Sequence, residues 1–330
     1  MQFNRCIDSS YEGLLSHGKP LRFLVDKACR STFKDTGLPL DLQLRSRNEV
    51  MLYLGLTRLL TVKLMKRSLQ LKVSADKFYR LQEHGVAERY SPDEYAKLAG
   101  DVQRYLDNVV VNKHHYEKEG HCQARLASRF GVHGQSGDRW TVVDREIGIA
   151  YDDGQKEKVW DPIRSRAIEL GRKLMALDPK KFGTSLAKKA FGDGLDFLLW
   201  NGKDREFGVA EVKDGHSTSG VYLSPRQVAA YTTIWRRFAA DQPDEALSGL
   251  RELVLQKQRL GLLPEHIQPP ESKADLRFIP VIIVRNPRFK GSVWESFDIV
   301  RRLVDKDWDG VLGGLKVYEA NEEGLREMQV

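Results

Sequence analysis

Three charged residues near the middle of the chain have types and spacing suited to catalysis. Asp196 lies in one apolar run, and Glu211 and Lys213 flank Val212 at the end of the next. Alternate side chains of a strand share a face, so Glu211 and Lys213 would point the same way. Two carboxylates and the Val212 carbonyl are hard oxygen ligands, which suit Mg²⁺. Such an ion would polarise a phosphodiester and activate a water, while Lys213 could orient that water and stabilise charge on the phosphate.

The loop between the two apolar runs decides whether the carboxylates meet. If Asn201-Gly202 made a two-residue turn, Asp196 would face Phe207, and Glu211 would lie roughly 13 Å further along. If the whole polar segment NGKDRE forms the loop, Asp196 faces Glu211 at about 5 Å between Cβ atoms. Opposed carboxylates repel each other, and a divalent cation would offset that repulsion. The alternative is a cross-strand ion pair of an Asp or Glu with Lys213, which is common at strand ends.

The order of these motifs resembles that of the PD-(D/E)XK nuclease superfamily, with leucine where the family name has proline. GLDF, AEVKDG and QVAAY follow one another as in RecB-type and lambda-exonuclease-type nucleases, and the EVK-to-LSxxQ run is similar to VRR-NUC domains. The resemblance covers residues 160–240 by motif and 278–320 by the pattern of strands and helices, and nothing before about residue 140. It implies a restriction-endonuclease-like core in which Asp196 and Glu211 bind the metal and Lys213 is the catalytic lysine.

The resemblance also assigns roles on the flanking helices. Gln227 and Tyr231, four residues apart, would share one helix face and support the site. The tetrapeptide SPRQ is equally typical of a capping box that starts a helix at Ser224, in which Gln227 would bond only to the backbone. Tyr231 has a core position as its alternative. A further acid is expected from a helix before the first core strand: Glu169, whose alternative is a solvated helix position, or its rival Glu146.

Positive charge is concentrated in one segment. Residues 45–80 carry nine Lys or Arg and two acidic residues, and this excess of seven equals the whole net charge of +7. Such a patch attracts polyanions, and its binding would be sensitive to salt. A solvated basic helix face is the alternative. Candidate contacts with nucleic acid are Arg58, Lys63, Lys66 and Arg67, together with Lys188 and Lys189, which follow the helix that carries Arg164, Arg166, Arg172 and Lys173.

Apolar spacing and turn signals predict two domains. From about Arg47 to Gln70, apolar residues recur at steps of three and four, which predicts a long helix. The segment SPDE, from Ser91, predicts the start of a second helix that runs to about Asn108. The Gly-rich stretch at 131–139 marks a boundary. We therefore predict a mainly helical, basic domain over 1–135, which binds nucleic acid or a protein partner, and a nuclease domain over 136–330.

Strands alternate with helices after this boundary. Short strands are expected at TVVDREIGIAY and KEKVW, and a helix should begin at Asp161-Pro162 and end before Asp178-Pro179. The two apolar runs follow, then a helix from Ser224 and another over about 245–260. The strand RFIPVIIV, a helix near 293–305 and the strand LKVYEA come last. The pattern predicts an α/β fold, in which helices cover a mixed sheet.

Several classes are excluded by composition and motifs. No apolar stretch approaches the roughly 20 residues that span a bilayer, and the N-terminus lacks the apolar region of a secretory signal, so we expect a cytoplasmic protein with no membrane partner. Cys6, Cys29 and Cys122 form no CxxC pair, which argues against a disulfide framework or a zinc ribbon. A polar helix end explains the His and Cys residues of segment 114–122 better than zinc does. No GxSxG or Walker A motif is present.

The leading hypothesis is a Mg²⁺-dependent deoxyribonuclease, in which Mn²⁺ could substitute and for which RNA is the alternative substrate. The second is a non-catalytic nucleic-acid-binding or assembly module that keeps the fold. The third is a scaffold with incidental charge at a strand end. Internal cutting or end-trimming, a homodimer or a monomer, and a role in phage defence, restriction, mobile-element processing or repair stay open at this stage.

Overall fold

The computed structural model describes residues 1–34, 36–75, 85–111, 116–152, 154–183, 194–287, 291–321 and 324–329. These form two compact units. Unit 1 comprises Met1–Phe3, Asp144–Ser248 and Pro270–Val330, and unit 2 comprises Asn4–Val143 and Gly249–Pro269. Each unit has its own sheet with helices, which confirms the expected mixed α/β class. The return of residues 249–269 to unit 2 was not anticipated.

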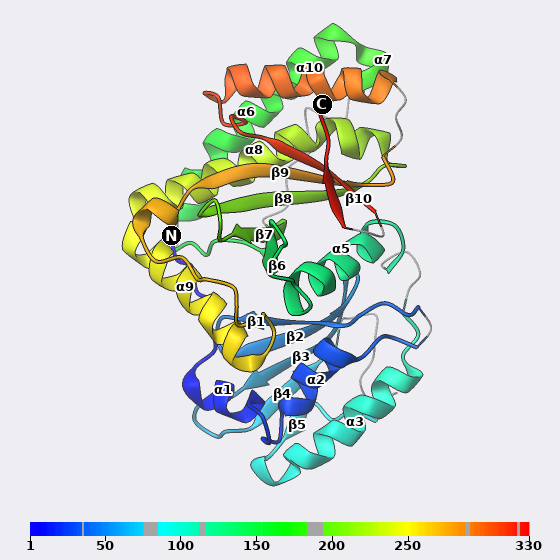
Figure 1. The fold of residues 1–330 in the computed structure, drawn as a ribbon, viewed down its shortest axis with the longest axis vertical. Helices are drawn as coiled ribbons and strands as arrows, with labels where there is room; N and C mark the ends of the chain where they lie inside the picture. Colours follow the sequence, from blue (N-terminus) through cyan, green and yellow to red (C-terminus); the bar gives the residue numbers. More distant parts are fainter. Residues whose placement is uncertain are drawn as a thin grey trace. The chain divides into compact units, whose positions relative to one another are not determined.

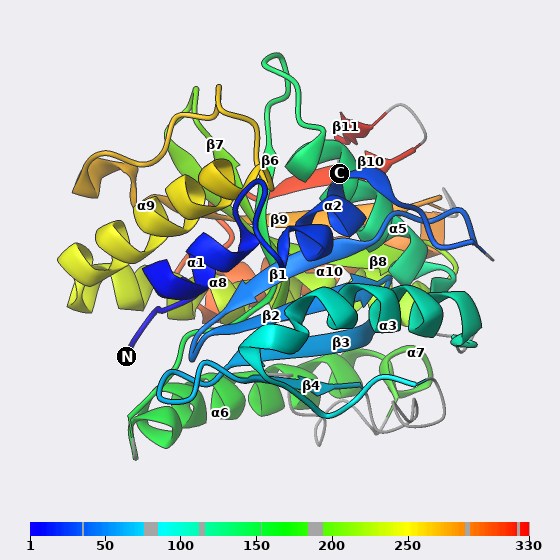
Figure 2. The same ribbon diagram turned by 90° about the horizontal axis from the view of Figure 1, so that it is seen from below.

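Unit 2 contains an antiparallel sheet with the strands in sequence order. Its strands are β1 (Asp41–Arg45), β2 (Glu49–Leu54), β3 (Thr57–Leu64), β4 (Leu71–Ser74) and β5 (Arg89–Tyr90). Its helices are α1 (Ser9–Leu15), α2 (Arg22–Arg30), α3 (Tyr95–Asn108) and α5 (Glu119–Ala127), with a 3₁₀ turn at Pro92–Glu94 and a π-helical turn at Ser128–Val132. Figure 2 shows β1 to β4 side by side.

The helix predicted over residues 47–70 is wrong, and the unit that contains it has a sheet beside its helices. The segment forms β2 and β3, joined by a tight turn in which Gly55 has a φ of 56°. Alternate residues of each strand enter the core, Val50, Leu52 and Leu54 on β2, then Leu60, Val62 and Leu64 on β3, and Tyr53, Leu59 and Thr61 are buried as well. Read as one segment, the alternating patterns of β2 and β3 resemble the three- and four-residue spacing of a helix. Gly55, which lies in the turn between the strands, was the better signal because it indicates a hairpin.

The alternation places an apolar face of this sheet against α1, α2 and α3 (Figure 1). Tyr11 of α1 packs into this core, and its hydroxyl donates to the Val62 carbonyl at 2.8 Å. The capping box predicted for the helix after Ser91 is confirmed: the Glu94 carboxylate accepts from the Ser91 backbone N–H at 3.0 Å. The 3₁₀ turn there leads into α3, which ends at Asn108 as expected.

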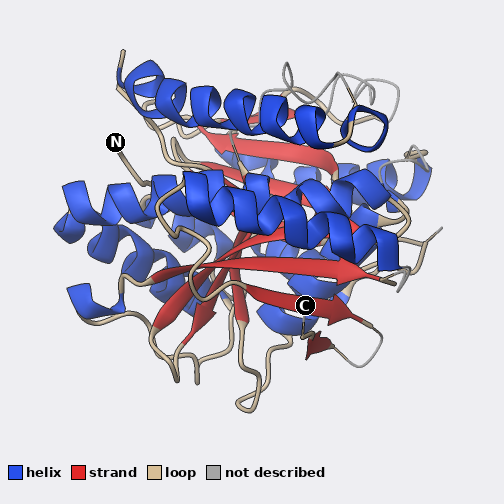
Figure 3. Ribbon diagram, turned by 90° about the horizontal axis from the view of Figure 1, so that it is seen from above, coloured by secondary structure: helices blue, strands red, loops and turns tan. Residues whose placement is uncertain are grey.

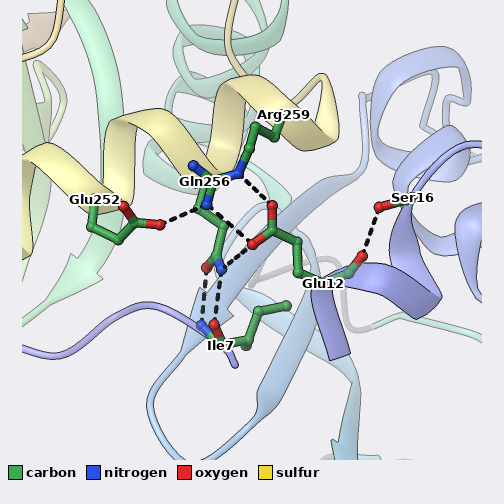
Figure 4. Close-up of polar contacts among 6 residues, drawn as sticks. All are labelled: Ile7, Glu12, Ser16, Glu252, Gln256 and Arg259. Carbon is green, nitrogen blue, oxygen red and sulfur yellow. Dashed lines mark hydrogen bonds and ion pairs between the residues drawn. The ribbon is translucent and has the colours of Figure 1, made fainter. Parts of the chain in front are cut away.

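The last part of α9 (Pro243–Leu260) is tied to the first residues of unit 2 (Figure 4). The Gln256 side chain accepts from the Ile7 N–H at 2.9 Å and donates to the Ile7 carbonyl at 2.8 Å. Gln256 also donates to Glu12, which accepts from Arg259 at 2.6 Å. Burial opposes ionisation of Glu12, but the hydrogen bonds from Arg259 and Gln256 outweigh it and lower its pKa. Contacts between residues this far apart in sequence explain why 249–269 belongs to unit 2.

Unit 1 is built on a mixed sheet in the order β11-β10-β9-β8-β7-β6. Pairs β7–β8 and β10–β11 are antiparallel, whereas β8–β9 and β9–β10 are parallel. The strands are β6 (Thr141–Ile147), β7 (Leu195–Asn201), β8 (Glu206–Asp214), β9 (Phe278–Arg285), β10 (Lys316–Ala320) and β11 (Leu325–Glu327). The helices are α6 (Gln155–Leu177), α7 (Pro179–Phe182), α8 (Thr218–Asp241), the start of α9 and α10 (Gly291–Asp307), with a 3₁₀ turn at Lys273–Asp275.

Two helices begin earlier than the sequence indicated. α6 begins at Gln155, so the strand expected at KEKVW is wrong, although the helix ends before Asp178 as predicted. α8 begins at Thr218 rather than Ser224, and Pro225 lies inside it. Proline leaves the carbonyl four residues before it without its usual N–H donor. Here the Ser224 hydroxyl donates to that carbonyl, on Val221, at 2.6 Å, which allows the helix to continue through the proline.

Helices α6, α8 and α10 lie on one side of this sheet (Figures 1 and 3). α8 packs directly on β8 and β9, where Trp235 stacks on Phe278 at 5.3 Å between ring centroids. Phe278 in turn stacks on Phe207 of β8 at 5.3 Å. Within the described residues, no helix is both long and apolar enough to cross a membrane.

Candidate functional site

The β7–β8 register brings the two predicted carboxylates to opposite positions. Leu198 pairs with Val209 and Trp200 with Phe207, as the long loop required. Asn201 and Glu206 also pair, so the connecting loop is residues 202–205, and the two-residue turn is excluded. Phe197 pairs with Ala210, so the next positions outward are Asp196 and Glu211. Opposed residues of antiparallel strands point to the same face, which places both carboxylates under α8.

Short hydrogen bonds hold this group together. Oδ2 of Asp196 accepts from the Val212 backbone N–H at 2.7 Å, so the first carboxylate is fixed to the strand that carries the second. Nζ of Lys213 donates to Oε2 of Glu211 at 2.7 Å. Glu211 is 2% exposed and Lys213 9%, so this ion pair is largely shielded from water. Lys213 is therefore in an ion pair, but with a residue of its own strand rather than across strands as the alternative had it.

The backbone N–H and C=O of Val212 point to the side of β8 on which β7 lies. Val212 donates its N–H toward β7, where Asp196 lies. A residue in an antiparallel ladder directs its N–H and C=O to the same neighbouring strand. The Val212 carbonyl therefore points to the side of β8 on which Asp196 lies, which is the direction expected of a third oxygen ligand.

Helix α8 covers the carboxylates with the predicted Gln-x-x-x-Tyr pair. Tyr231 is buried, and burial together with the neighbouring charges of Glu211 and Asp196 raises the pKa of its phenol well above the usual range. Gln227 hydrogen-bonds with Tyr231, which opposes that rise. The capping interpretation of Gln227 is wrong because Ser224 lies inside α8. Trp160 of α6 packs edge-on against Tyr231 at 6.2 Å between ring centroids.

Two glycines that sequence reasoning missed shape the end of β8. A Cβ on Gly215 would lie 2.1 Å from the Asn286 carbonyl oxygen, so only glycine fits the close approach of these two backbones. A Cβ on Gly220, in the first turn of α8, would lie 2.7 Å from Ser217 Oγ and 3.6 Å from Lys213 Cδ. The methylene chain of Lys213 thus passes beside the start of the helix. In the sequence, the glycine directly after EVKD could have indicated this close approach of two backbones.

Both candidate third acids are exposed to solvent. Glu169 is on the exposed face of α6, where its carboxylate accepts from Arg172 at 3.2 Å. Glu146 is an exposed residue of β6 with a φ of 50°. Its neighbour Asp144, which sequence reasoning did not single out, is fully buried, and its carboxylate accepts from the Arg145 N–H at 2.9 Å. Among the described residues, no group of three or more His, Cys, Asp or Glu is placed to hold a metal ion.

The predicted nucleic-acid contacts lie on strands and turns. Arg58 and Lys63 are on β3, and Lys66 and Arg67 are in the loop between β3 and β4, so the interpretation as a basic helix face is wrong. Lys63 pairs with Glu49 at 2.7 Å. Lys188 and Lys189 lie outside the described residues, as do His114 and His115.

The donor set fits a hard divalent cation. Asp196, Glu211 and the Val212 carbonyl could supply oxygen ligands, and with two carboxylates such an ion would keep several waters, as Mg²⁺ does. Comparison of the chain with protein-family models, curated proteins and solved structures finds no match.

Proposed function

We propose that the protein is a metal-dependent nuclease of the PD-(D/E)XK type that hydrolyses phosphodiester bonds of DNA. One observation carries the proposal: Asp196 and Glu211 occupy opposed strand positions, with Lys213 two residues on and Tyr231 above them. A solvent-exposed ion pair would require neither a second, opposed carboxylate nor a tyrosine that covers it. Burial of charge is costly unless the charges are paired, so a cluster of this kind is typical of a functional site.

In this proposal, Asp196, Glu211 and the Val212 carbonyl hold Mg²⁺, with Mn²⁺ as a substitute. The ion would supply Lewis acidity toward a phosphodiester and lower the pKa of a bound water. Lys213 moves from Glu211 toward the phosphate, where its ammonium orients the attacking water and offsets the charge that develops on oxygen. Lysine suits this task because its compact charge sits on a flexible chain.

Gln227 and Tyr231 are positioning residues in this proposal. The buried phenol of Tyr231 is neutral and can donate a hydrogen bond toward the carboxylates, whose negative charges contribute to its raised pKa. Gln227 orients that phenol from one turn earlier on α8. Glu169 is left out because it is solvent-exposed and paired with Arg172. We also propose that the protein acts in the cytoplasm, since Cys6, Cys29 and Cys122 are widely separated in the sequence with no CxxC pair, which suits a reducing compartment.

The test is cleavage of linear, circular and single-stranded DNA by the purified protein in Mg²⁺, Mn²⁺ or EDTA, followed by product length over time. Wild type should cut with either metal and stop in EDTA, and Glu211→Gln should not cut. Asp244→Asn is the control, because this carboxylate is 84% exposed on α9. Circular substrate distinguishes internal cutting from end-trimming. DNA retention with no cleavage under either metal would overturn the nuclease and favour a binding module that keeps the fold.

A further inference from the structure

One face of the unit 2 sheet carries a row of charged side chains that crosses all its strands. The register pairs Arg45 with Glu49, Glu49 with Lys63, Lys63 with Lys72, and Lys72 with Arg89. Opposed residues point to the same face, at about 4.8 Å from strand to strand. Arg45 is buried, Glu49 and Lys63 are half-buried, and Lys72 and Arg89 are exposed. The row therefore opens to solvent at its basic end.

The hairpin at this open end is purely basic. Residues 57–74, which are β3, β4 and their loop, contain five Lys or Arg and no Asp or Glu. Glu49 pairs with Lys63 at 2.7 Å, and Asp8 approaches Lys66 at 3.3 Å, although the Lys66 side chain is 70% exposed. Arg67 is exposed in the loop. The cations that face solvent thus outnumber the acids that approach them.

The loop between β3 and β4 also holds two large apolar side chains in water. Met65 is 42% exposed and Leu69 48%. Leu69 has a φ of 56°, a left-handed conformation that is unfavourable for leucine. Its N–H donates to the Met65 carbonyl at 2.8 Å, and its own carbonyl accepts from the Tyr95 hydroxyl of α3. The loop is therefore fixed in a strained form that exposes these side chains, which is typical of a binding element.

We propose that Lys66, Arg67, Lys72 and Arg89, with Met65 and Leu69, form a surface that binds the backbone of nucleic acid; we call it the hairpin surface. The cations would contact phosphates, and the two apolar side chains would contact sugars or wedge against bases. A line of cations across the strands matches a linear polyanion better than a flat membrane. The inference rests on the proposed function, because it identifies where the nuclease would grip its substrate.

The test measures binding of labelled duplex and single-stranded oligonucleotides in Mg²⁺ over a salt series, with Asp196→Asn in every protein to prevent cutting. Lys66→Ala/Arg67→Ala and Lys72→Ala/Arg89→Ala should each weaken binding at least tenfold. Each should also reduce the slope of log K against log salt for duplex by about 2, because each phosphate contact contributes about 0.9. Met65→Ser/Leu69→Ser should weaken binding without changing the slope.

The matched control is Arg237→Ala/Arg251→Ala, which removes the same charge from exposed positions on α8 and α9. It should bind as the parent does. Hairpin variants that bind oligonucleotide like this control would overturn the inference, as would hairpin-dependent binding to vesicles of anionic lipid with no effect on oligonucleotides. If wild type cleaves DNA and the hairpin variants bind oligonucleotide as the parent does, the proposed nuclease is supported and only the hairpin surface is overturned. If binding depends on the hairpin residues but wild type does not cleave, the hairpin surface is supported and the proposed nuclease is overturned.

Discussion

The Asp196 carboxylate on β7 accepts a hydrogen bond from the Val212 N–H on β8, with 2.7 Å between Oδ2 and N. The bond extends the antiparallel ladder with a side chain, at the point where the two carboxylates come opposite each other. Asp196 therefore has a structural task as well as the proposed metal-binding one. Substitutions can separate the two.

Asp196→Asn keeps an oxygen that can accept from Val212 but removes the negative charge. We expect cleavage to be lost, with a change in unfolding free energy below about 1 kcal/mol. Asp196→Ala should lose cleavage and also destabilise the fold by about 1 kcal/mol, the typical value of one hydrogen bond. Cleavage assays and urea unfolding check both variants. Retained cleavage in Asp196→Asn would remove this residue from the proposed site.

The Lys213–Glu211 pair should contribute both stability and catalysis. Lys213→Met removes the ammonium that lies 2.7 Å from the buried Glu211 carboxylate, so we expect a loss of about 3 kcal/mol in unfolding free energy. Adding Glu211→Gln should restore most of that stability without restoring cleavage. Lys316→Met, which breaks the more exposed pair with Glu327, is the control and should cost less than about 1 kcal/mol. Additive effects of the two substitutions would contradict the coupling, and cleavage by Lys213→Met would contradict the catalytic role.

The sequence narrowed the pairing of β7 and β8 to two registers, because either a two-residue turn or a longer polar loop could join the two apolar runs. The structure has the longer loop, over residues 202–205, and this register places Asp196 opposite Glu211. The start of α8 could not be predicted in the same way, because Pro225 stays in the helix through the Ser224 hydroxyl, a compensation that the helix rules omit. Contacts between Gln256 and Ile7 depend on the tertiary fold, and no pattern along the chain encodes them.

Glu169 tests how far the family pattern can be carried onto this chain. Its carboxylate is 53% exposed and pairs with Arg172, whereas Glu211 and Lys213 on β8 are buried. Glu169→Gln should therefore cut DNA within about twofold of wild type, since an exposed ion pair contributes little. Initial cleavage rates at saturating Mg²⁺ give the comparison, with Glu211→Gln as the inactive reference. A loss of tenfold or more would show that the third acid comes from α6 after all.

Gly215 should be intolerant of any side chain. A methyl group there would meet the Asn286 carbonyl at 2.1 Å, and two backbones cannot separate cheaply at the ends of paired strands. We expect Gly215→Ala to lower the unfolding free energy by about 1 to 3 kcal/mol, the usual range for overpacking. Gly137→Ala is the control, because a Cβ there meets nothing within 4 Å. Equal stability of the two variants in urea would show that the turn after β8 relaxes easily.

The pair of Arg205 and Asp275 should make part of the stability depend on pH. Two hydrogen bonds, at 2.7 and 2.6 Å, link the β7–β8 loop to the 3₁₀ turn before β9. The Arg205 guanidinium holds the pKa of Asp275 well below its ordinary value of 3.8. A carboxylate with a lowered folded-state pKa stabilises the protein above its unfolded pKa, and that stability is lost as the pH falls toward the folded value.

Asp275→Asn should therefore be less stable than wild type by a constant amount from pH 7 down to about 5. The difference should shrink below about pH 4, because the wild-type carboxylate then takes up a proton on unfolding. Urea unfolding of both proteins between pH 7 and 3 gives the measurement. Asp241→Asn, whose partner Arg237 is exposed on the same helix, should show a small difference with little pH dependence. A constant difference between wild type and Asp275→Asn down to pH 3 would mean that the pKa of Asp275 is not lowered.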